Sequence, residues 1–177
     1  ATTGATLWQH ATGGPLYSSP AVSLDGATVF VGTYDNTYAL HAATGTVKWH
    51  GATGSAVWSS PAVSPDGSAV YIGSYDGNVY ALNAAPGVTQ GPRATGGPVQ
   101  SSPAVSSDGS ALFVGSNDKN VYSIDAATGA VLWSYATTGQ VSASPAVSAD
   151  GVVYIADPIA GIHMFDLTSS YLIRNLL

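Results

Sequence analysis

Ser18-Ser19-Pro20-Ala21-Val22-Ser23 is the stretch that decides the fold, because it returns three more times along the chain. The second and third copies span 59–64 and 101–106, and the last runs from Ala143 to Ser148. The prolines of the four copies, spaced 41, 42 and 42 residues apart, are Pro20, Pro61, Pro103 and Pro145. A period of this length indicates structural units that stack on one another in one array.

Each period contains short apolar segments separated by turns. In the second copy the segments 56–64, 68–74 and 79–83 are rich in residues that favour strands. The Asp-Gly pair within 75–78 is a hairpin signal between two of them. In the first copy a fourth strand at 46–49 is clear. The sequence therefore predicts an all-β propeller made of four blades of about 42 residues, each a four-stranded antiparallel sheet.

Composition excludes several classes of function. The chain has 177 residues, 45% hydrophobic and 8% charged, with a net charge of −6. Its four cations are scattered and form no basic stripe, so we expect no nucleic-acid partner. No apolar run approaches the ~18 residues of a membrane-spanning helix. Cysteine and glutamate are absent, which removes thiol and Glu-dependent chemistry. The histidines lack metal-ligand spacing, and no metal site is predicted.

A second motif is more specific than the first. Residues 122–133 read Tyr-Ser-Ile-Asp-Ala-Ala-Thr-Gly-Ala-Val-Leu-Trp, with Trp four residues after Gly. The Thr-Gly…Trp pattern recurs at 44–49 and opens the chain at 3–8. In these motifs residues 1–170 resemble the pyrroloquinoline-quinone (PQQ) enzyme repeat, the PQQ-like tryptophan-docking β-propeller family. The resemblance implies an extracytoplasmic location, although the chain shows no signal peptide. It also implies that three tryptophans dock between neighbouring blades: Trp8, Trp49 and Trp133.

The pattern breaks at two places and leaves two ways to close the ring. Gly91 stands where a docking Trp is expected, and the signature decays after Asp166. Residues 171–177 are then either a degenerate fourth strand or a foreign tail. A strand at about 5–10 has no blade of its own. It completes the fourth blade of its own chain in a four-bladed ring, or that of a second chain in an eight-bladed ring from two copies.

Candidate binding residues lie in the loops that enter each blade and in the turns between second and third strands. In this type of propeller both sets lie on one face. The entry loops are followed by a position at which the copies differ: Tyr17, Trp58, Gln100 and Ser142. The turns contribute Tyr34, Asp35, Tyr75, Asp76, Asn117 and Asp118. Aspartates favour turns for structural reasons, whereas aromatic side chains and Gln at a channel mouth suit a ligand or a protein partner.

The family resemblance extends to quinoprotein dehydrogenases, which hold PQQ beside Ca²⁺ with a Glu, an Asn and an Asp. This chain has no Glu, and Asp35, Asp76 and Asp118 lie on separate blades. We therefore expect no catalytic residues and no cofactor. The favoured hypothesis is a binding or assembly scaffold with a protein partner or small ligand at the channel-mouth face. A fragment of a PQQ-dependent dehydrogenase and a partial or engineered array whose main property is self-association remain alternatives.

Overall fold

The computed structural model describes residues 4–34, 36–166 and 172–176. Within these ranges the regular structure consists of sixteen β-strands in four antiparallel sheets, each made of strands consecutive in the chain. The described part of the chain contains no helix long and apolar enough to cross a membrane. The expectation of an all-β propeller array is confirmed.

The strands repeat in the same order in each sheet. The first sheet consists of β1 (Ala21–Val22), β2 (Thr28–Gly32), β3 (Asn36–His41) and β4 (Val47–Ala52). The second consists of β5 (Ala62–Val63), β6 (Ala69–Gly73), β7 (Asn78–Asn83) and β8 (Thr89–Ala94). The third consists of β9 (Ala104–Val105), β10 (Ala111–Gly115), β11 (Asn120–Asp125) and β12 (Val131–Ala136). The fourth consists of β13 (Ala146–Val147), β14 (Val152–Asp157), β15 (Gly161–Asp166) and β16 (Leu172–Leu176).

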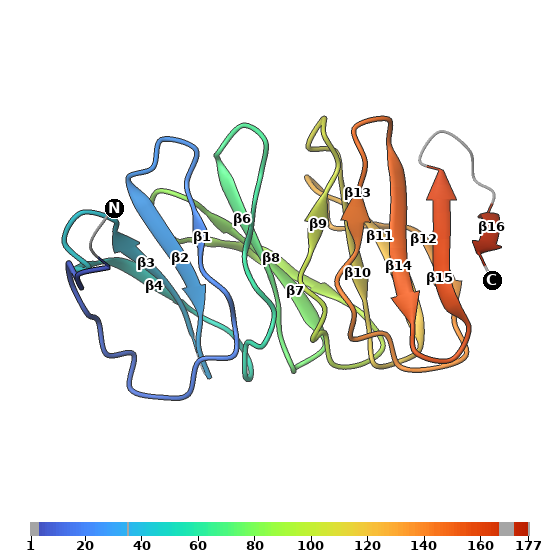
Figure 1. Cartoon of the computed structure of the whole chain (residues 1–177), viewed down its shortest axis with the longest axis horizontal. Coiled ribbons are helices and arrows are strands. Elements are labelled where there is room, and N and C mark those ends of the chain that lie inside the picture. Colours follow the sequence, from blue (N-terminus) through green and yellow to red (C-terminus); the bar gives the residue numbers. More distant parts are fainter. Residues whose placement is uncertain (1–3, 35, 167–171, 177) are drawn as a thin grey trace.

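The four sheets, called blades from here on, stand side by side in chain order. Their first strands contact one another in succession, β1 with β5, β5 with β9, and β9 with β13. The first and fourth blades lie at opposite ends of the row (Figure 1). The described blades thus form an open row in this view, and the two ways of closing a ring stay predictions.

The structure differs from the sequence expectation at both ends. Residues 5–10 were expected to form a strand that completes a blade, but residues 4–20 contain no strand. A strand needs the free edge of another strand, and the edge of β15 is already paired with β16. Part of the 171–177 tail is thus the fourth strand of the fourth blade, the first of the two interpretations of that segment.

The apolar core lies in the joints between blades. The second strand of an inner blade is covered on both faces, so β6 and β10 are buried along their whole length. A valine from the loop that enters each following blade fills the joint: Val57, Val99 and Val141 are all fully buried. Each faces a glycine at the end of a second strand, where an added Cβ would overlap the valine. The recurrent glycine is therefore required by close approach rather than by backbone conformation.

The serines of the repeated motif each make a different hydrogen bond. The first serine lies just before the first strand and ties the chain there to the end of the second strand, as where the Gly73 amide donates to Ser59 Oγ over 2.7 Å. The last serine organises the Asp-Gly turn. Ser64 Oγ accepts from the Ala69 amide over 2.9 Å and donates to Asp66 Oδ1 over 2.6 Å. The fourth copy begins with Ala143 and so lacks the first of these hydroxyl groups.

The second serine of the motif links neighbouring blades. The backbone N–H of Ser19 donates to Ser60 Oγ over 2.9 Å, and the N–H of Ser60 donates to Ser102 Oγ over 2.8 Å. The N–H of Ser102 donates to Ser144 Oγ over 3.0 Å. We call these four residues the serine ladder. Identical bonds at successive joints fix the same offset between each pair of innermost strands.

Two tryptophans dock on the turn between a third and a fourth strand, Trp49 across the first joint and Trp8 from the segment that precedes the first blade. Trp8 Nε1 donates to the Ala42 carbonyl over 2.8 Å, and Trp49 Nε1 donates to the Ala84 carbonyl over 3.0 Å. Each ring lies over the glycine of the same turn, Gly45 or Gly87. Trp133 packs between the rings of Phe113 and Phe165, at centroid distances of 6.1 and 5.1 Å. The turn on which Trp133 would dock falls outside the described residues.

Arg93 takes the docking position that Gly91 leaves open. Its Nη2 donates to the Ala126 carbonyl over 2.7 Å, and its methylene groups lie over Gly129. The side chain is buried. Burial lowers the pKa of the guanidinium, an effect that Tyr71 and Asp125 oppose. An arginine two residues further along the strand thus reproduces both contacts of a docking tryptophan.

Removing a docking side chain should destabilise the array. We expect Trp49→Ala to lower the free energy of unfolding by about 2–4 kcal/mol, since the ring is partly buried. Arg93→Ala should cost about 2–3 kcal/mol through lost packing of its methylenes and an unpaired carbonyl. Lys119→Ala removes an exposed cation and should change stability by less than about 0.5 kcal/mol. Urea unfolding measures all three, and equal stability of the arginine and lysine variants would contradict the docking role of Arg93.

Candidate partner-binding face

The loops that enter each blade and the turns between second and third strands lie on one face, called the loop face. The Tyr75 amide donates to the Ala56 carbonyl over 2.8 Å, and the Asn117 amide donates to the Pro98 carbonyl over 2.9 Å. These bonds join an entry loop to a turn within the second and third blades. The loop face forms the lower edge of the array in Figure 1. The two sets of candidate residues therefore lie on the same face, as expected from the sequence.

Four aromatic side chains of the first two blades are exposed on the loop face. The rings of Tyr17 and Trp58 have centroids 5.3 Å apart, and those of Trp58 and Tyr75 are 5.1 Å apart. Tyr34 lies beside Gly14 of the neighbouring entry loop. Between 38% and 63% of the surface of each side chain is accessible. We call Tyr17, Tyr34, Trp58 and Tyr75 the aromatic surface.

The corresponding positions of the third and fourth blades are polar. Gln100 and Asn117 are partly buried, and Ser142 is exposed. Asn117 Oδ1 is enclosed and has no hydrogen-bond partner among the described residues. The candidate site predicted from the sequence is thus divided into an aromatic half, in which the rings of Tyr17, Trp58 and Tyr75 touch, and a polar half.

Asp76 and Asp118 bind the protein's own loops. Asp76 Oδ2 accepts from the Gly54 amide over 2.9 Å and from the Tyr80 hydroxyl over 2.5 Å. Asp118 Oδ2 accepts from the Gly96 amide over 2.7 Å and from the hydroxyl of Tyr122, four residues further along, over 2.6 Å. We call such a carboxylate an aspartate bridge, because it ties a turn to the loop that enters its blade. Asp35, the matching residue of the first blade, lies outside the described residues.

These hydrogen bonds shift the titration of the carboxylates. Burial alone would raise the pKa of Asp76, but the Tyr80 hydroxyl and the Asn78 amide outweigh it, so the pKa lies below its ordinary value. The same opposition of burial and donated hydrogen bonds lowers the pKa of Asp118. Burial and the bond to the carboxylate raise the pKa of Tyr80. Both bridges therefore carry a negative charge at neutral pH.

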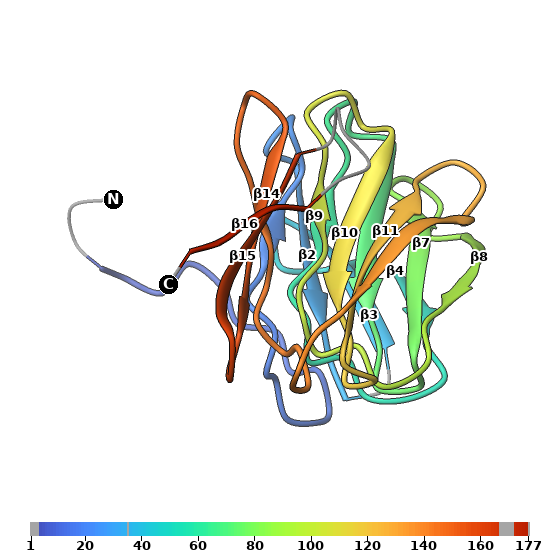
Figure 2. The same ribbon diagram turned by 90° about the vertical axis from the view of Figure 1, so that its right-hand side faces the viewer.

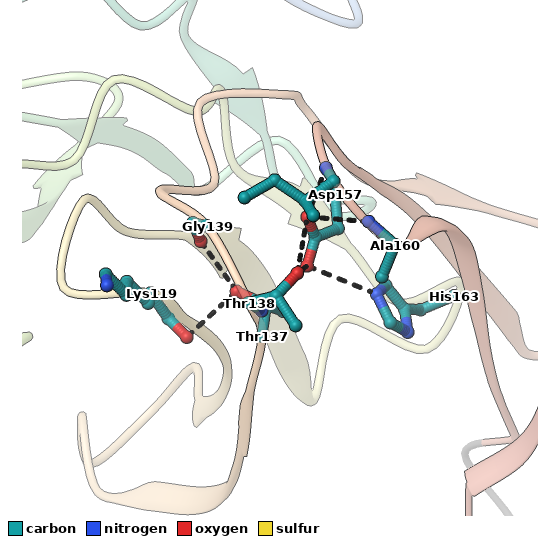
Figure 3. A network of polar contacts seen from close by, with 8 residues as sticks. Lys119, Thr137, Thr138, Gly139, Asp157, Ala160 and His163 are labelled. Atoms are coloured by element: carbon teal, nitrogen blue, oxygen red, sulfur yellow. Dashed lines mark hydrogen bonds and ion pairs between the residues drawn. The ribbon is translucent and has the colours of Figure 1, made fainter.

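The fourth blade builds its aspartate bridge from other residues (Figure 3). Asp157 Oδ2 accepts from the Thr138 amide over 3.0 Å, and Oδ1 accepts from the Ile159 amide over 2.7 Å. His163 occupies the place of the tyrosine, with Nε2 3.6 Å from Asp157 Oδ2. Burial opposes ionisation of Asp157, yet the backbone amides hold its pKa well below its ordinary value. Sequence alignment of the copies places Ile159 in this column, so Asp157 was missed.

The carboxylates of the loop face do not form a set of ligands for a calcium ion beside a quinone. The carboxylates of Asp76 and Asp118 already accept hydrogen bonds from their own blades. Among the described residues, no three acidic or histidine side chains lie close enough together to hold a metal ion. Glu is absent from the whole sequence. No catalytic step is therefore derived for this chain.

Hollows of the surface lie away from the aromatic surface. One of about 610 Å³ between the first and second blades is lined by residues that include Leu24, Lys48 and Asp66. Similar hollows of about 470 Å³ recur at the next two joints and include Asp108 and Asp150. They repeat because each is lined by the Asp-Gly turns of two adjacent blades, and their recurrence indicates geometry rather than a ligand site.

Acid should destabilise the array by protonating the aspartate bridges. Because the pKa of Asp76, Asp118 and Asp157 is lower in the folded than in the unfolded chain, the unfolded chain binds protons first. The free energy of unfolding should be constant above about pH 5 and fall as pH decreases toward ~2. Urea unfolding at several pH values measures this slope, and Asp118→Asn should reduce it. A slope unchanged by that substitution would show that the bridge is energetically silent.

Comparisons with known proteins agree with the geometry. The family model described as outer membrane protein assembly factor BamB matches residues 1–90 and 90–168. Among solved structures, BamB from Moraxella catarrhalis superposes with a TM-score of 0.81 at 23% identity. The alignment covers 95% of this chain and 52% of that chain, so this chain spans about half the length of the structure that it matches. No curated protein matches the sequence.

Proposed function

The chain belongs to the PQQ-repeat family described as outer membrane protein assembly factor BamB, and on that basis we propose that it is a non-enzymatic scaffold that binds a protein partner through the aromatic surface. The name of the family suggests a partner among outer membrane proteins or their assembly machinery. It also supports an extracytoplasmic location. Because the chain covers 52% of the matched structure, partner and location are proposals for this chain.

The observation that carries the proposal is the contact of Tyr17, Trp58 and Tyr75 in one exposed row. Contiguous exposed apolar patches mark interaction sites on soluble proteins, and Tyr and Trp bring large contact area to such sites. Such residues are enriched among those that dominate interface energies. The row lies on loops positioned by two rigid blades, which holds the rings in place before a partner arrives.

Absence of enzymatic activity is supported by the residues present. The carboxylates of the loop face serve the aspartate bridges, and neither Glu nor Cys occurs in the sequence. A quinoprotein dehydrogenase needs a general base and a set of calcium ligands. Those side chains must not already be engaged in hydrogen bonds that hold the fold. The dehydrogenase-fragment hypothesis therefore has less support than a scaffold.

Truncation of the central ring should weaken partner binding. The probe is a fluorescently labelled outer-membrane β-barrel protein, unfolded in urea and diluted into buffer. We expect Trp58→Ala to weaken its binding at least about tenfold by fluorescence anisotropy, as for a central aromatic anchor. Val88→Ala, an exposed apolar residue outside the loop face, is the matched control. Equal affinity of the wild-type chain and both variants would remove the aromatic surface as the binding site.

A calorimetric titration with pyrroloquinoline quinone in the presence of Ca²⁺ tests the competing hypothesis. We expect no saturable heat, because the bridging carboxylates would have to break their bonds to Gly54 and Gly96 before binding a metal ion. Saturable micromolar binding, lost in Asp118→Asn, would favour the dehydrogenase fragment instead.

A further inference from the structure

The fourth strand of each blade is the outer edge of its sheet. In the third blade β12 pairs with β11, and among the described residues no backbone hydrogen bond joins it to another strand. Figure 2 shows β9, β10 and β11 in that order toward one margin of the array, and β12 continues the sheet beyond β11. An edge strand presents unpaired N–H and C=O groups that can pair with another chain. This edge lies away from the first strands, so its exposure does not depend on what adjoins the first or fourth blade.

The register of β12 identifies the backbone groups at its free edge. The Thr137 N–H donates to the Lys119 carbonyl over 2.7 Å. Along an antiparallel pair of strands, hydrogen-bonded and non-hydrogen-bonded residue pairs alternate. Counted from Lys119 and Thr137, the pair of Tyr122 and Ser134 is not hydrogen-bonded. The N–H and C=O of Ser134 therefore point away from β11, and its side chain is exposed.

The other blades carry residues at this position that hinder strand pairing. The residues that correspond to Ser134 are His50, Pro92 and Arg174. Proline has no N–H to donate, and charged side chains and prolines are the means by which natural edge strands avoid pairing. A β-bulge occurs in all four blades and does not distinguish them. Of the four fourth strands that the structure describes, β12 alone contains neither a charged residue nor a proline.

The edge of β12 adjoins the hollow between the third and fourth blades, called the third hollow. Leu132 and Trp133 of β12 line this hollow of about 470 Å³ together with Asp108 and Asp150. Of the surface of Leu132, 53% is accessible. A strand added to β12 would therefore meet an exposed apolar side chain and two carboxylates.

The third hollow differs in charge from its counterpart between the first and second blades. Lys48 stands at the position of Leu132 and lines that first hollow. Among the described residues that line the third hollow there is no cation. The Ser106 hydroxyl donates to the Asp108 carboxylate and lowers its pKa to about 2, so Asp108 is charged at neutral pH. The matching group for the third hollow is therefore a cation from elsewhere.

We propose that β12 binds an extended segment of a partner polypeptide as an additional strand, and that a lysine or arginine of this segment enters the third hollow beside Asp108 and Asp150. Main-chain hydrogen bonds to Ser134 contribute affinity, and the acidic hollow contributes specificity. A second copy of this chain fits less well, because it would bring a net charge of −6 and a second acidic hollow to the same edge. The inference does not rest on the proposed function, since β12 is not part of the aromatic surface.

Fluorescence anisotropy with the whole 177-residue chain tests strand addition. The probe is a labelled synthetic peptide of alternating valine and threonine with one central lysine, and we expect saturable binding. Ser134→Pro should weaken binding at least about tenfold, because it removes the outward donor. The second blade already has proline at this position, so the substitution is compatible with the fold of a blade. Ser134→Thr keeps the N–H and is the matched control, with the affinity of the wild type.

A second variant tests the role of charge. Leu132→Lys supplies the cation that Lys48 supplies in the first hollow. The wild-type chain should bind the lysine peptide more tightly than a peptide with glutamate in its place, and Leu132→Lys should remove this preference. Equal binding of the two peptides by the wild-type chain would contradict entry of a cation into the third hollow.

Amide hydrogen exchange measured by NMR locates the added strand. The Ser134 N–H should exchange more slowly when the lysine peptide is bound, and circular dichroism establishes that each variant is folded. A chain that does not bind the peptide overturns the proposal, as does binding that Ser134→Pro leaves unchanged. A dimer of the wild-type chain that Ser134→Pro abolishes would place a second copy at this edge and would also overturn it.

Discussion

The joint between adjacent blades is the constraint on which the rest of the structure depends. Every blade is too thin to bury its own apolar side chains, so each second strand is covered only when a neighbour packs on both sides. Each joint among the first three blades contains a hydrogen bond of the serine ladder, a valine packed against a glycine, and a docking side chain over a turn. These contacts must occur at the same place on each blade, and this requirement accounts for the near-constant period of 41 to 42 residues.

Much of this arrangement could be predicted from the sequence because the joint contacts repeat with the sequence. The Ser-Ser-Pro-Ala-Val-Ser copies mark the innermost strands, and the Thr-Gly…Trp motif locates the docking turns. The prediction failed where another residue performs the same task from a different position. Arg93 replaces a tryptophan from two residues away, and Asp157 replaces an aspartate from two residues away, with His163 in the tyrosine position itself. An alignment of the repeats shows only that the usual residue is missing at such positions, whereas the contact itself is retained in the structure.

The candidate site was predictable in part for a related reason. That the entry loops and turns share a face follows from the order of strands in a propeller. Which candidate side chains touch one another depends on their directions across neighbouring blades. An alignment of the repeats gives the positions of the residues and not these directions. The rings of Tyr17, Trp58 and Tyr75 meet, whereas Asp76 and Asp118 turn toward backbone amides. The Asp-x-x-x-Tyr spacing in the second and third blades was the available signal for the bridges.

The central claim is that the same specific polar contacts hold the array within and between its blades, and that apolar packing alone does not. Amide hydrogen exchange measured residue by residue by NMR tests it most directly. The account predicts slow exchange at Ser60, Ser102, Gly54 and Gly96, whose N–H groups donate across a joint or to an aspartate bridge although none belongs to a strand. Exchange of these amides at the rate of exposed loop residues would contradict it.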